Sequence, residues 1–429
     1  MKILLIMRAT YKSYREHLRT LLGEGLEIHL VTGVADARDD HRFANVVPVA
    51  GMSEDEVVDT VVRYAKDTGI GFALTFWEAD IVVTARVNEY LGQPWANVAA
   101  ARTARDKSAQ RRLLADAGLP SVEFRTLGAG EAGDDALSEI AGWADSVVVK
   151  PARLAASVGV KRVTGHEALR EAVADIRRVA GGEAWLADFV TDDPDLVVVE
   201  EYLPGREVTV DGVVVDGRFH LAGITNKMAM DGPYFEEDYY TLPYRFPEEE
   251  GEITGIVQGV VDALGLVQAT FNIELRQDAA GRFRVIEFSP RMSGGQNYLN
   301  LRTAHGFDLV RVHVRAASAG GSVLTEQDLA RHPGRAATCI KFAYRGGRVV
   351  RNNAGEAAHS RHFLEYTPSA APGKLLRQPP EAWYEVAGSL AVAVPFRGLD
   401  DIDRVERVAD DLDRKLDVVT TGHLSRSAQ

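Results

Sequence analysis

The sequence predicts a mixed fold, in which an α/β domain at the start is followed by α+β domains. Three observations support this class. Short apolar runs alternate with helical patterns in residues 1–103, strands predominate after Asp106, and a linker around Arg331–Gly334 precedes a last segment of strands and a helix. We therefore expect an N-terminal α/β domain over 1–103, an α+β region over 104–332 and a small α+β domain over 333–429. A chain of 429 residues is long enough for two to four such units.

The α/β domain is predicted from its alternating pattern. The expected strands are Ile3–Met7, Glu27–Thr32, Val46–Val49 and Phe72–Phe76, and the expected helices are Tyr14–Leu22, Glu54–Asp67 and Ile81–Leu91. Strands that alternate with helices in this way imply a parallel sheet. The first strand is not followed by Gly-x-Gly-x-x-Gly, so the dinucleotide fingerprint is absent.

The α+β region begins with a helix that Asp106 can cap and that runs to about Ala117, where Gly118 and Pro120 form a stop signal. The expected strands that follow are Val122–Leu127, Val147–Lys150, Val158–Val163, Val197–Tyr202, Glu207–Val215, Phe219–Ile224, Thr270–Leu275 and Phe283–Phe288, with helices at Ala168–Val179 and Ile253–Leu264. The C-terminal domain is expected to contain Ala337–Tyr344, Arg348–Arg351, a polar loop near Pro368–Pro380 and a helix over Asp403–Leu416.

Composition excludes several classes of function. With 46% hydrophobic and 26% charged residues the chain is typical of globular proteins. A net charge of -13 argues against an extended surface for nucleic acid or anionic membranes, and we expect neither partner. The single cysteine, Cys339, excludes an intrachain disulfide and favours a reducing compartment. Since no apolar segment is long enough to span a bilayer, we expect a cytoplasmic protein.

The most informative motif is a predicted hairpin with two glutamates. Asp278–Gly281 is expected to form the turn. With an even-length loop, Glu274 would face Val285 and Asn272 would face Glu287, which puts both glutamates diagonally on one face. Two such carboxylates can share a hard cation, expected to be Mg²⁺ with Mn²⁺ as an alternative. A three-residue loop would turn them to opposite faces, and two solvated glutamates are the simpler interpretation of the hairpin alone.

Basic residues accompany the hairpin. Arg291 follows the second strand, where it could meet transferring phosphoryl oxygens. Lys150 ends a strand before a loop of small residues that contains Ser157 and Gly159, and such loops let backbone N–H groups approach phosphates. Lys107 begins a helix, where the helix dipole disfavours a cation unless an anion is near. An ordinary surface residue is the simpler interpretation of each lysine taken alone.

A further motif is the charged segment Glu200–Glu207, which follows an apolar strand directly. An elbow between two strands has free backbone groups that can mimic base pairing to adenine, and a carboxylate a few residues on can bind ribose hydroxyls. Taken alone the segment is also compatible with a charged turn.

The order of these motifs resembles that of the ATP-grasp superfamily over roughly residues 106–296. The matching positions are Lys107, Lys150, the small-residue loop, Glu200-x-x-Leu203-x-x-x-Glu207, Glu274, Glu287 and Arg291. Members of that superfamily use ATP to activate a carboxylate as an acyl-phosphate, which an amine then attacks. Family members commonly show Glu-x-Asn-x-Arg at the second metal strand, and this chain has Ser289 at the asparagine position.

The resemblance implies that the α+β region consists of two lobes, a small one over 104–202 and a large one over 203–332, and it implies a role for each motif. Lys107 and Lys150 would hold the ATP phosphates under the loop around Ser157, while Glu274 and Glu287 would bind Mg²⁺. Arg291 would stabilise the charge of the transferred phosphoryl group. Adenine and ribose would be bound by Glu200, Tyr202, Leu203 and Glu207.

Within the superfamily, the L-amino-acid ligase branch is the most similar, and small carboxylate and amine substrates are the expected partners. The similarity lies in Trp77-Glu78, Thr225-Asn-Lys227 and Pro290-Arg-Met-Ser-Gly-Gly295. It implies that Lys227 touches the γ-phosphate and that Glu78 binds a substrate ammonium group, although a carboxylate at a helix start is the simpler interpretation of Glu78 alone. Ser293, Gly294 and Gly295 would bind a substrate carboxylate, and Met228–Pro243 would be a lid.

Two other functions stay open at this point. One is a carboxylating ligase of the biotin-carboxylase or purine-biosynthesis kind, which would require bicarbonate. The other is a non-catalytic ATP-binding regulatory protein, which would bind ATP without releasing ADP. A homodimer is expected from the family alone.

Overall fold

The computed structural model describes residues 1–128, 134–143, 146–154, 157–182, 195–229, 237–319, 324–332, 334–378 and 385–422. The chain divides into two compact units. The first comprises Met1–Ala222, Glu248–Ser293 and Asp308–Ala330, and the second comprises Gly223–Pro247, Gly294–Phe307 and Arg331–Gln429. The predicted division into four domains stays a prediction.

The first unit begins with a parallel sheet of strand order β3-β2-β1-β4, as the alternating pattern predicts. Its strands are β1 (Lys2–Ile6), β2 (Glu27–Thr32), β3 (Asn45–Pro48) and β4 (Ala73–Leu74), and its helices are α1 (Arg15–Gly23), α2 (Glu54–Thr68), α3 (Ile81–Tyr90) and α4 (Val98–Ala104). Short 3-10 turns lie at η1 (Ala35–Asp39) and η2 (Glu78–Asp80). Buried valines of α2 pack against β1 and β2, which buries the apolar face that the sequence periodicity predicts.

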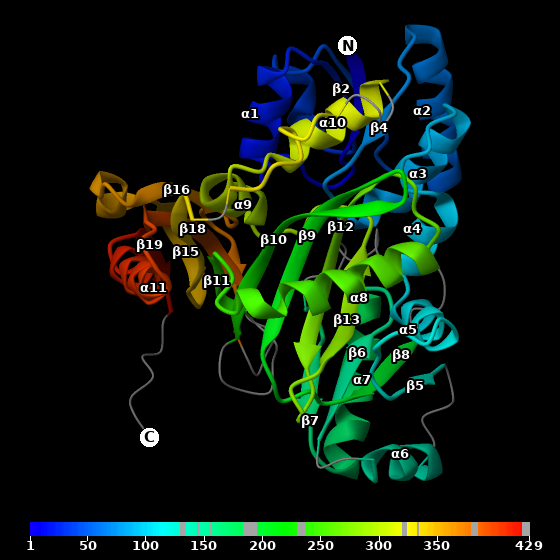
Figure 1. Ribbon diagram of the computed structural model, residues 1–429, viewed down its shortest axis with the longest axis vertical. Helices are drawn as coiled ribbons and strands as arrows, with labels where there is room; N and C mark the ends of the chain where they lie inside the picture. Colours follow the sequence, from blue (N-terminus) through cyan, green and yellow to red (C-terminus); the bar gives the residue numbers. More distant parts are fainter. Residues whose placement is uncertain are drawn as a thin grey trace. The chain divides into compact units, whose positions relative to one another are not determined.

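A second, antiparallel sheet of order β5-β8-β6-β7 follows (Figure 1). Its strands are β5 (Phe124–Leu127), β6 (Val147–Pro151), β7 (Lys161–Val163) and β8 (Val197–Glu201), and its helices are α6 (Asp134–Ala141) and α7 (His166–Gly182). Val147, Val149, Val197 and Val199 form a core with the apolar residues of α6 and α7. Because side chains alternate along a strand, Lys150 and Glu200 point to the other face of this sheet.

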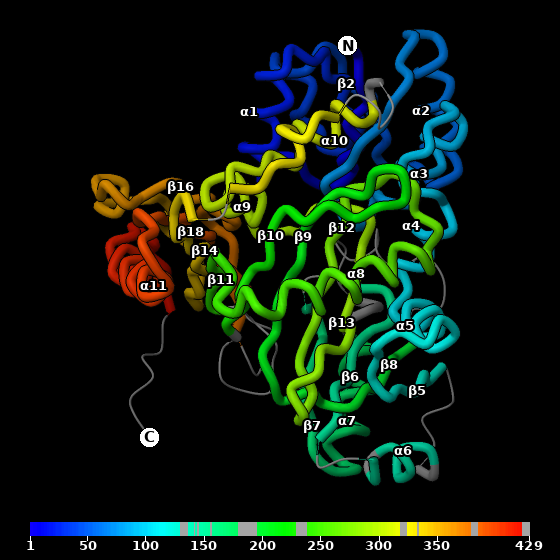
Figure 2. The backbone as a smooth tube through the Cα atoms, viewed as in Figure 1, coloured from blue at the N-terminus to red at the C-terminus, as the bar shows by residue number. Residues whose placement is uncertain are grey.

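The third part of the first unit contains strands in the order β13-β12-β9-β10. They are β9 (Glu207–Val215), the start of β10 (Arg218–Ala229), β12 (Ala269–Gln277) and β13 (Phe283–Ser289). Helices α5 (Lys107–Asp116), α8 (Glu250–Ala263) and α10 (Leu309–Ala319) accompany them, with the turn η4 (Pro247–Glu249) before α8. Helix α5 contacts β13, and Figure 2 follows the backbone through both.

The second unit contains the end of β10 and the strand order β11-β14-β18-β16, with a small sheet of order β17-β15-β19. The elements are β11 (Glu237–Leu242), α9 (Asn297–His305), β14 (Ala336–Tyr344), β15 (Gly347–Asn353), η6 (Gly355–His359), β16 (Phe363–Pro368), β17 (Leu375–Leu376), β18 (Val386–Pro395), α11 (Asp400–Asp413) and β19 (Asp417–Thr421). Its core is built from β14, β18 and the apolar face of α11.

Two predicted segments are described only in part, and the role of the first as a lid stays a prediction. Of the predicted lid Met228–Pro243, residues 230–236 lie outside the described residues, and 237–242 form β11, which is paired with β10 and β14. The predicted polar loop near Pro368–Pro380 contains the short strand β17, and its last two residues are not described. In the described part of the chain, no helix combines the length and the apolar character that a membrane crossing requires.

Candidate active site

The two glutamates of the hairpin face each other. Glu274 on β12 lies directly opposite Glu287 on β13, and directly opposed residues point to the same face of a sheet. The convergence of the two carboxylates agrees with the prediction, but the predicted pairing of Glu274 with Val285 was wrong. Val285 is paired with Leu275 instead.

A β-bulge accounts for this register. Residues 278–282, five in number, connect Gln277 to its partner Phe283, so the expected even-length loop was also wrong. An odd loop in a regular ladder would turn the glutamates to opposite faces. The register shifts by one residue between Glu274 and Leu275, with Ile286 as the extra residue of β13, and this shift restores the facing pair.

Strand β9 continues the same polar face. Its Thr209 lies opposite Glu274, and its Asp211 lies opposite Asn272. Asp211 is fully buried and accepts hydrogen bonds from the backbone N–H of Ser293 at 2.9 Å and from its hydroxyl at 2.7 Å. The predicted role of Ser293 in binding a substrate carboxylate stays a prediction, and in this structure Asp211 engages both of these donors.

Helix α5 places Lys107 beside Glu287 of the glutamate pair. The Asp106 carboxylate caps the helix by accepting from the N–H groups of Ser108 and Ala109, as the sequence predicts. This cap fixes the first turn, from which the Lys107 ammonium donates to Glu287 Oε1 at 3.2 Å and to the Leu154 carbonyl at 2.6 Å. Lys107 is buried, so its charge is held beside the carboxylate that the sequence assigns to a metal.

A second buried ion pair lies on the neighbouring sheet. The Lys150 ammonium is 2.6 Å from Glu200 Oε2, and both side chains are buried. Burial alone would raise the pKa of the Glu200 carboxyl, but the charges of Arg111 and Lys150 hold that pKa below its ordinary value. The predicted lysine and the predicted glutamate are therefore brought together as a pair.

Arg111 joins this ion pair to the hairpin, and the sequence prediction missed it. Its Nε donates to Glu200 Oε1 at 2.7 Å, and its Nη2 donates to the carbonyl of Ile286. Arg111 lies one helical turn after Lys107 on the buried face of α5, which also carries Leu114. The spacing from Lys107 to Arg111 to Leu114, four and then three residues, is typical of one helix face and distinguishes Arg111 from the exposed Arg112.

The elbow between β8 and β9 carries the predicted adenine and ribose residues. Leu203 is buried, and Glu207 pairs with Arg276, whose Nη1 lies 3.0 Å from Glu207 Oε2. The Tyr202 ring is covered by the guanidinium of Arg162, whose carbon lies 3.8 Å from the ring centroid. Arg276 of β12 thus pairs with Glu207 and also lies 5.4 Å from the centroid of the Tyr202 ring. The predicted contacts of Tyr202, Leu203 and Glu207 with a nucleotide stay predictions.

The small-residue loop is described in part, because residues 155 and 156 are outside the described range. Ser157 has a φ of 53° and Gly159 a φ of 76°, both in the left-handed region. The Ser157 carbonyl accepts from the N–H of Val160 at 3.0 Å, which closes a tight turn. The turn is consistent with a phosphate loop, and its predicted role stays a prediction.

At the end of β13, Arg291 meets Glu78 of the turn η2. Glu78 Oε2 accepts from Arg291 Nε and, at 3.0 Å, from the Ser289 hydroxyl, while Arg105 lies 3.6 Å from Glu78 Oε1. Burial would raise the pKa of the Glu78 carboxyl, but Arg291 and Arg105 hold it below its ordinary value. Ser289, at the position where the family commonly has asparagine, thus donates to Glu78.

Three predicted residues belong to the second unit. Lys227 on β10 has its ammonium 6.0 Å from the ring centroid of Tyr240 on β11. Gly295 has a φ of 64°, and a Cβ there would lie 3.1 Å from atoms of both Tyr240 and Phe342. Gly294 accepts a hydrogen bond from the N–H of Asn297 at the start of α9. Their predicted contacts with phosphate and substrate stay predictions.

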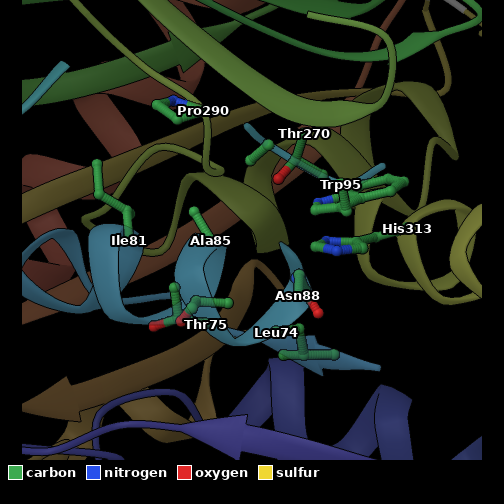
Figure 3. A pocket seen from close by; sticks show the side chains of 11 residues that line it. Leu74, Thr75, Ile81, Ala85, Asn88, Trp95, Thr270, Pro290 and His313 are labelled. Atoms are coloured by element: carbon green, nitrogen blue, oxygen red, sulfur yellow. The ribbon is translucent and has the colours of Figure 1, made fainter. Parts of the chain in front are cut away.

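A small cavity in the first unit is separate from these residues (Figure 3). The volume of the cavity is about 20 Å³, which is room for about one water molecule and too little for an amino acid. His313 lines it and stacks on Trp95 at a centroid distance of 4.0 Å. Among the described residues, neither ring nitrogen of His313 has a hydrogen-bond partner, and the same holds for Thr84 Oγ1.

Comparison with known proteins identifies the family. Residues 144–299 match the ATP-grasp domain. The D-alanine–D-alanine ligase of Desulforudis audaxviator (strain MP104C) is 30% identical over 225 residues, which cover 50% of this chain and 67% of that ligase. The chain belongs to the ATP-grasp family.

Two further proteins are similar to this chain. The alanine–anticapsin ligase of Bacillus subtilis (strain 168) is 25% identical over 272 residues, which cover 60% of this chain and 56% of that ligase. The crystal structure of the L-amino acid ligase from Bacillus licheniformis has a TM-score of 0.80 at 20% identity and covers 98% of this chain and 99% of that one. The chain thus spans little more than half the length of the alanine–anticapsin ligase.

The donor set of this ATP-grasp protein fits Mg²⁺ shared with a nucleotide. Glu274 and Glu287 present carboxylate oxygens from adjacent strands, and proteins often bind Mg²⁺ through one or two carboxylates with phosphates as further ligands. Within the described ranges, no group of three or more His, Cys, Asp or Glu residues is placed to hold a metal.

Proposed function

We propose that this protein is an ATP-dependent ligase that activates the carboxylate of one amino acid as an acyl-phosphate and joins it to the amine of a second, releasing ADP and phosphate. The observation that carries the proposal is the convergence of Glu274, Glu287 and Lys107 in the first unit, next to the Lys150–Glu200 pair. The relatives support the substrate class, because their names describe ligases of alanine, D-alanine and L-amino acids.

The nucleotide would lie with its phosphates at Lys107 and Lys150 and its adenosine at the β8–β9 elbow. Lys107 and Lys150 are each held by a carboxylate, so the position of both ammonium groups is fixed before the nucleotide binds. Phosphate oxygens would then accept further hydrogen bonds from these two groups. Backbone groups around Tyr202 and Leu203 would bind adenine, and Glu207 would bind ribose. Glu200 contributes by holding Lys150, since Arg111 and Lys150 engage its two oxygens.

Phosphoryl transfer requires positioning and charge neutralisation. Glu274 and Glu287 would hold Mg²⁺, which would neutralise phosphate charge when bound. Arg291 would stabilise the transferred group, and its orientation is set by Glu78 and by its own bond to the Met292 carbonyl at 2.6 Å. The acyl-phosphate then needs protection from water until the amine attacks its carbonyl carbon and phosphate leaves.

The test is turnover with Mg-ATP and pooled amino acids, followed by ADP release and by mass spectrometry of the products. Hydroxylamine should intercept the acyl-phosphate as a hydroxamate. Glu287→Gln should abolish the hydroxamate and ADP release, whereas Glu252→Gln, at an exposed position of α8, should match the wild type. ADP release that depends on bicarbonate, or ATP binding without any turnover, would replace the proposal with a carboxylating enzyme or a non-catalytic protein.

A further inference from the structure

The geometry points to Arg111 as a positioning residue that holds the β-bulge at Ile286 and thereby brings Glu287 opposite Glu274. The inference rests on the proposed function, because it concerns the glutamates that we assign to Mg²⁺ and ATP. It adds a residue that the motif pattern does not contain, and it gives this residue a role through its contacts with other side chains and not with substrate.

The bulge decides whether the two glutamates can act together. With five residues between Gln277 and Phe283, an unbroken ladder would pair Glu274 with Ile286 and turn Glu287 to the other face. A bulge interrupts the ladder locally, and its extra residue loses the normal cross-strand pairing. The backbone carbonyl of Ile286, the extra residue, therefore needs a hydrogen-bond donor from outside the ladder.

Arg111 supplies that donor. Its Nη2 donates to the Ile286 carbonyl, one residue before Glu287, while its Nε donates to Glu200 Oε1 at 2.7 Å. The guanidinium is planar, so these two bonds fix its orientation and set the distance between β8 and the bulge of β13. The same helix face carries Lys107, which donates to Glu287 itself at 3.2 Å.

Stability alone does not explain a buried arginine here. Arg111 is fully buried, and among the described residues its Nη1 has no hydrogen-bond partner. Replacing buried ionic groups with apolar side chains of similar volume is often neutral or stabilising. An arginine at this position is better explained by the geometry that it imposes on Glu200 and on the bulge.

The experiment compares Arg111→Met and Arg111→Lys with the matched exposed substitutions Arg112→Met and Arg112→Lys. For each variant, calorimetry measures the affinity for ADP with Mn²⁺ and for ADP in EDTA, and thermal unfolding with circular dichroism reports the fold. Arg111→Met should weaken the binding of ADP with Mn²⁺ by at least 10-fold and should weaken metal-free ADP less. Arg111→Lys keeps a positive charge beside Glu200 but cannot donate to Glu200 and Ile286 together. It should therefore lose mainly the gain in ADP affinity that Mn²⁺ provides. The Arg112 variants should match the wild type.

Two outcomes would overturn the inference. One is a folded Arg111→Met variant whose gain in ADP affinity from Mn²⁺ equals that of the wild type. The other applies if Arg111→Met does not fold: a folded Arg111→Lys variant whose gain in ADP affinity from Mn²⁺ equals that of the wild type would overturn the inference in the same way. Ligation by the wild-type enzyme is measured in parallel. A wild type that binds ADP with Mn²⁺ but joins no amino acids contradicts the ligase proposal and leaves the Arg111 result to be judged by itself.

Discussion

The Lys107 ammonium lies 3.2 Å from Glu287 Oε1, so a buried cation touches the carboxylate that we assign to the metal. Its other acceptor is the Leu154 carbonyl at 2.6 Å. The side chain of Glu287 is 29% exposed and that of Lys107 is 7% exposed, so solvent reaches the pair from the glutamate side. A phosphate that approaches from there would meet the cation and the carboxylate together.

This relationship gives the first prediction. Lys107→Met should raise the KM for ATP and lower kcat, with a loss in kcat/KM of about 10- to 100-fold, because a hydrogen bond to a charged group contributes about 1.5–3 kcal/mol. Lys66→Met, at an exposed position of α2, is the matched control and should leave both constants unchanged. Steady-state ADP release measures the effect, and wild-type kinetics in the Lys107 variant would remove this lysine from the phosphate site.

The second prediction concerns Glu78. Its carboxylate accepts from Arg291 Nε and from the Ser289 hydroxyl, so it aims the guanidinium at the end of β13. Glu78→Gln removes the charge that balances Arg291 and Arg105, and kcat should fall by about 100-fold, the usual effect of losing one preorganised charge contact. The KM for ATP should change little, because Glu78 contacts Arg291, Ser289 and Arg105, which lie outside the predicted adenine and ribose site.

The control for Glu78 is Glu89→Gln at an exposed position of α3, which should keep full activity. If Glu78 instead binds a substrate ammonium group, as the family resemblance implies, the variant should show a raised KM for one amino acid and a kcat near that of the wild type. The split between KM and kcat therefore separates the positioning role from the substrate-binding role.

The hairpin shows how far the sequence determined the site. Residue types and their order predicted that Glu274 and Glu287 share a face, and the structure pairs them directly. Their role as magnesium ligands, which rests on the cost of burying unpaired acids, stays a prediction. Their register was not predictable in the same way. A bulge adds one residue to one strand without changing the residue types. The even loop that the prediction assumed put both glutamates on one face, but it paired Glu274 with Val285 and not with Glu287.

Arg111 was missed for a different reason. In the sequence it stands next to Arg112, and nothing in the residue type says which of the two is buried. The helix periodicity from Lys107 through Arg111 to Leu114 carries that information, but it becomes evident only after α5 is placed against β13. The cap at Asp106 and the parallel N-terminal sheet were predictable because they depend on local patterns.

The third prediction is a pH dependence of stability that comes from His313. Burial lowers the pKa of His313 from its ordinary value of 6.5 to about 3 in the folded protein. Between these values the unfolded chain binds a proton that the folded chain does not. The free energy of unfolding should therefore fall as the pH falls from about 6.5 toward 3, by about 1 kcal/mol per pH unit from this residue.

His313→Phe keeps an aromatic ring beside Trp95 and removes the titrating group. Urea unfolding at pH 7 and pH 5 should show a smaller loss of stability in the variant than in the wild type. His305, in the second unit, has a pKa lowered to about 4 by burial and contributes with the same sign in both proteins, so it cancels in the comparison. An equal pH slope in the two proteins would contradict a buried, neutral His313.

The last prediction compares two glycines. A Cβ at Gly205, in the β8–β9 elbow, would lie 2.5 Å from Gln277 Cβ and 2.7 Å from the Gln277 carbonyl oxygen, so the elbow must move away from β12. Gly205→Ala should destabilise the protein by about 1–3 kcal/mol, as overpacking does, and should raise the Kd for ATP because Leu203 and Glu207 flank the displaced segment. At Gly255, within α8, a Cβ would meet nothing within 4 Å, so Gly255→Ala should stabilise by about 0.5–1 kcal/mol and leave the Kd unchanged. Denaturant unfolding and ATP calorimetry test both variants. A Gly205→Ala protein that binds ATP like the Gly255→Ala protein would mean that the elbow does not contact the nucleotide.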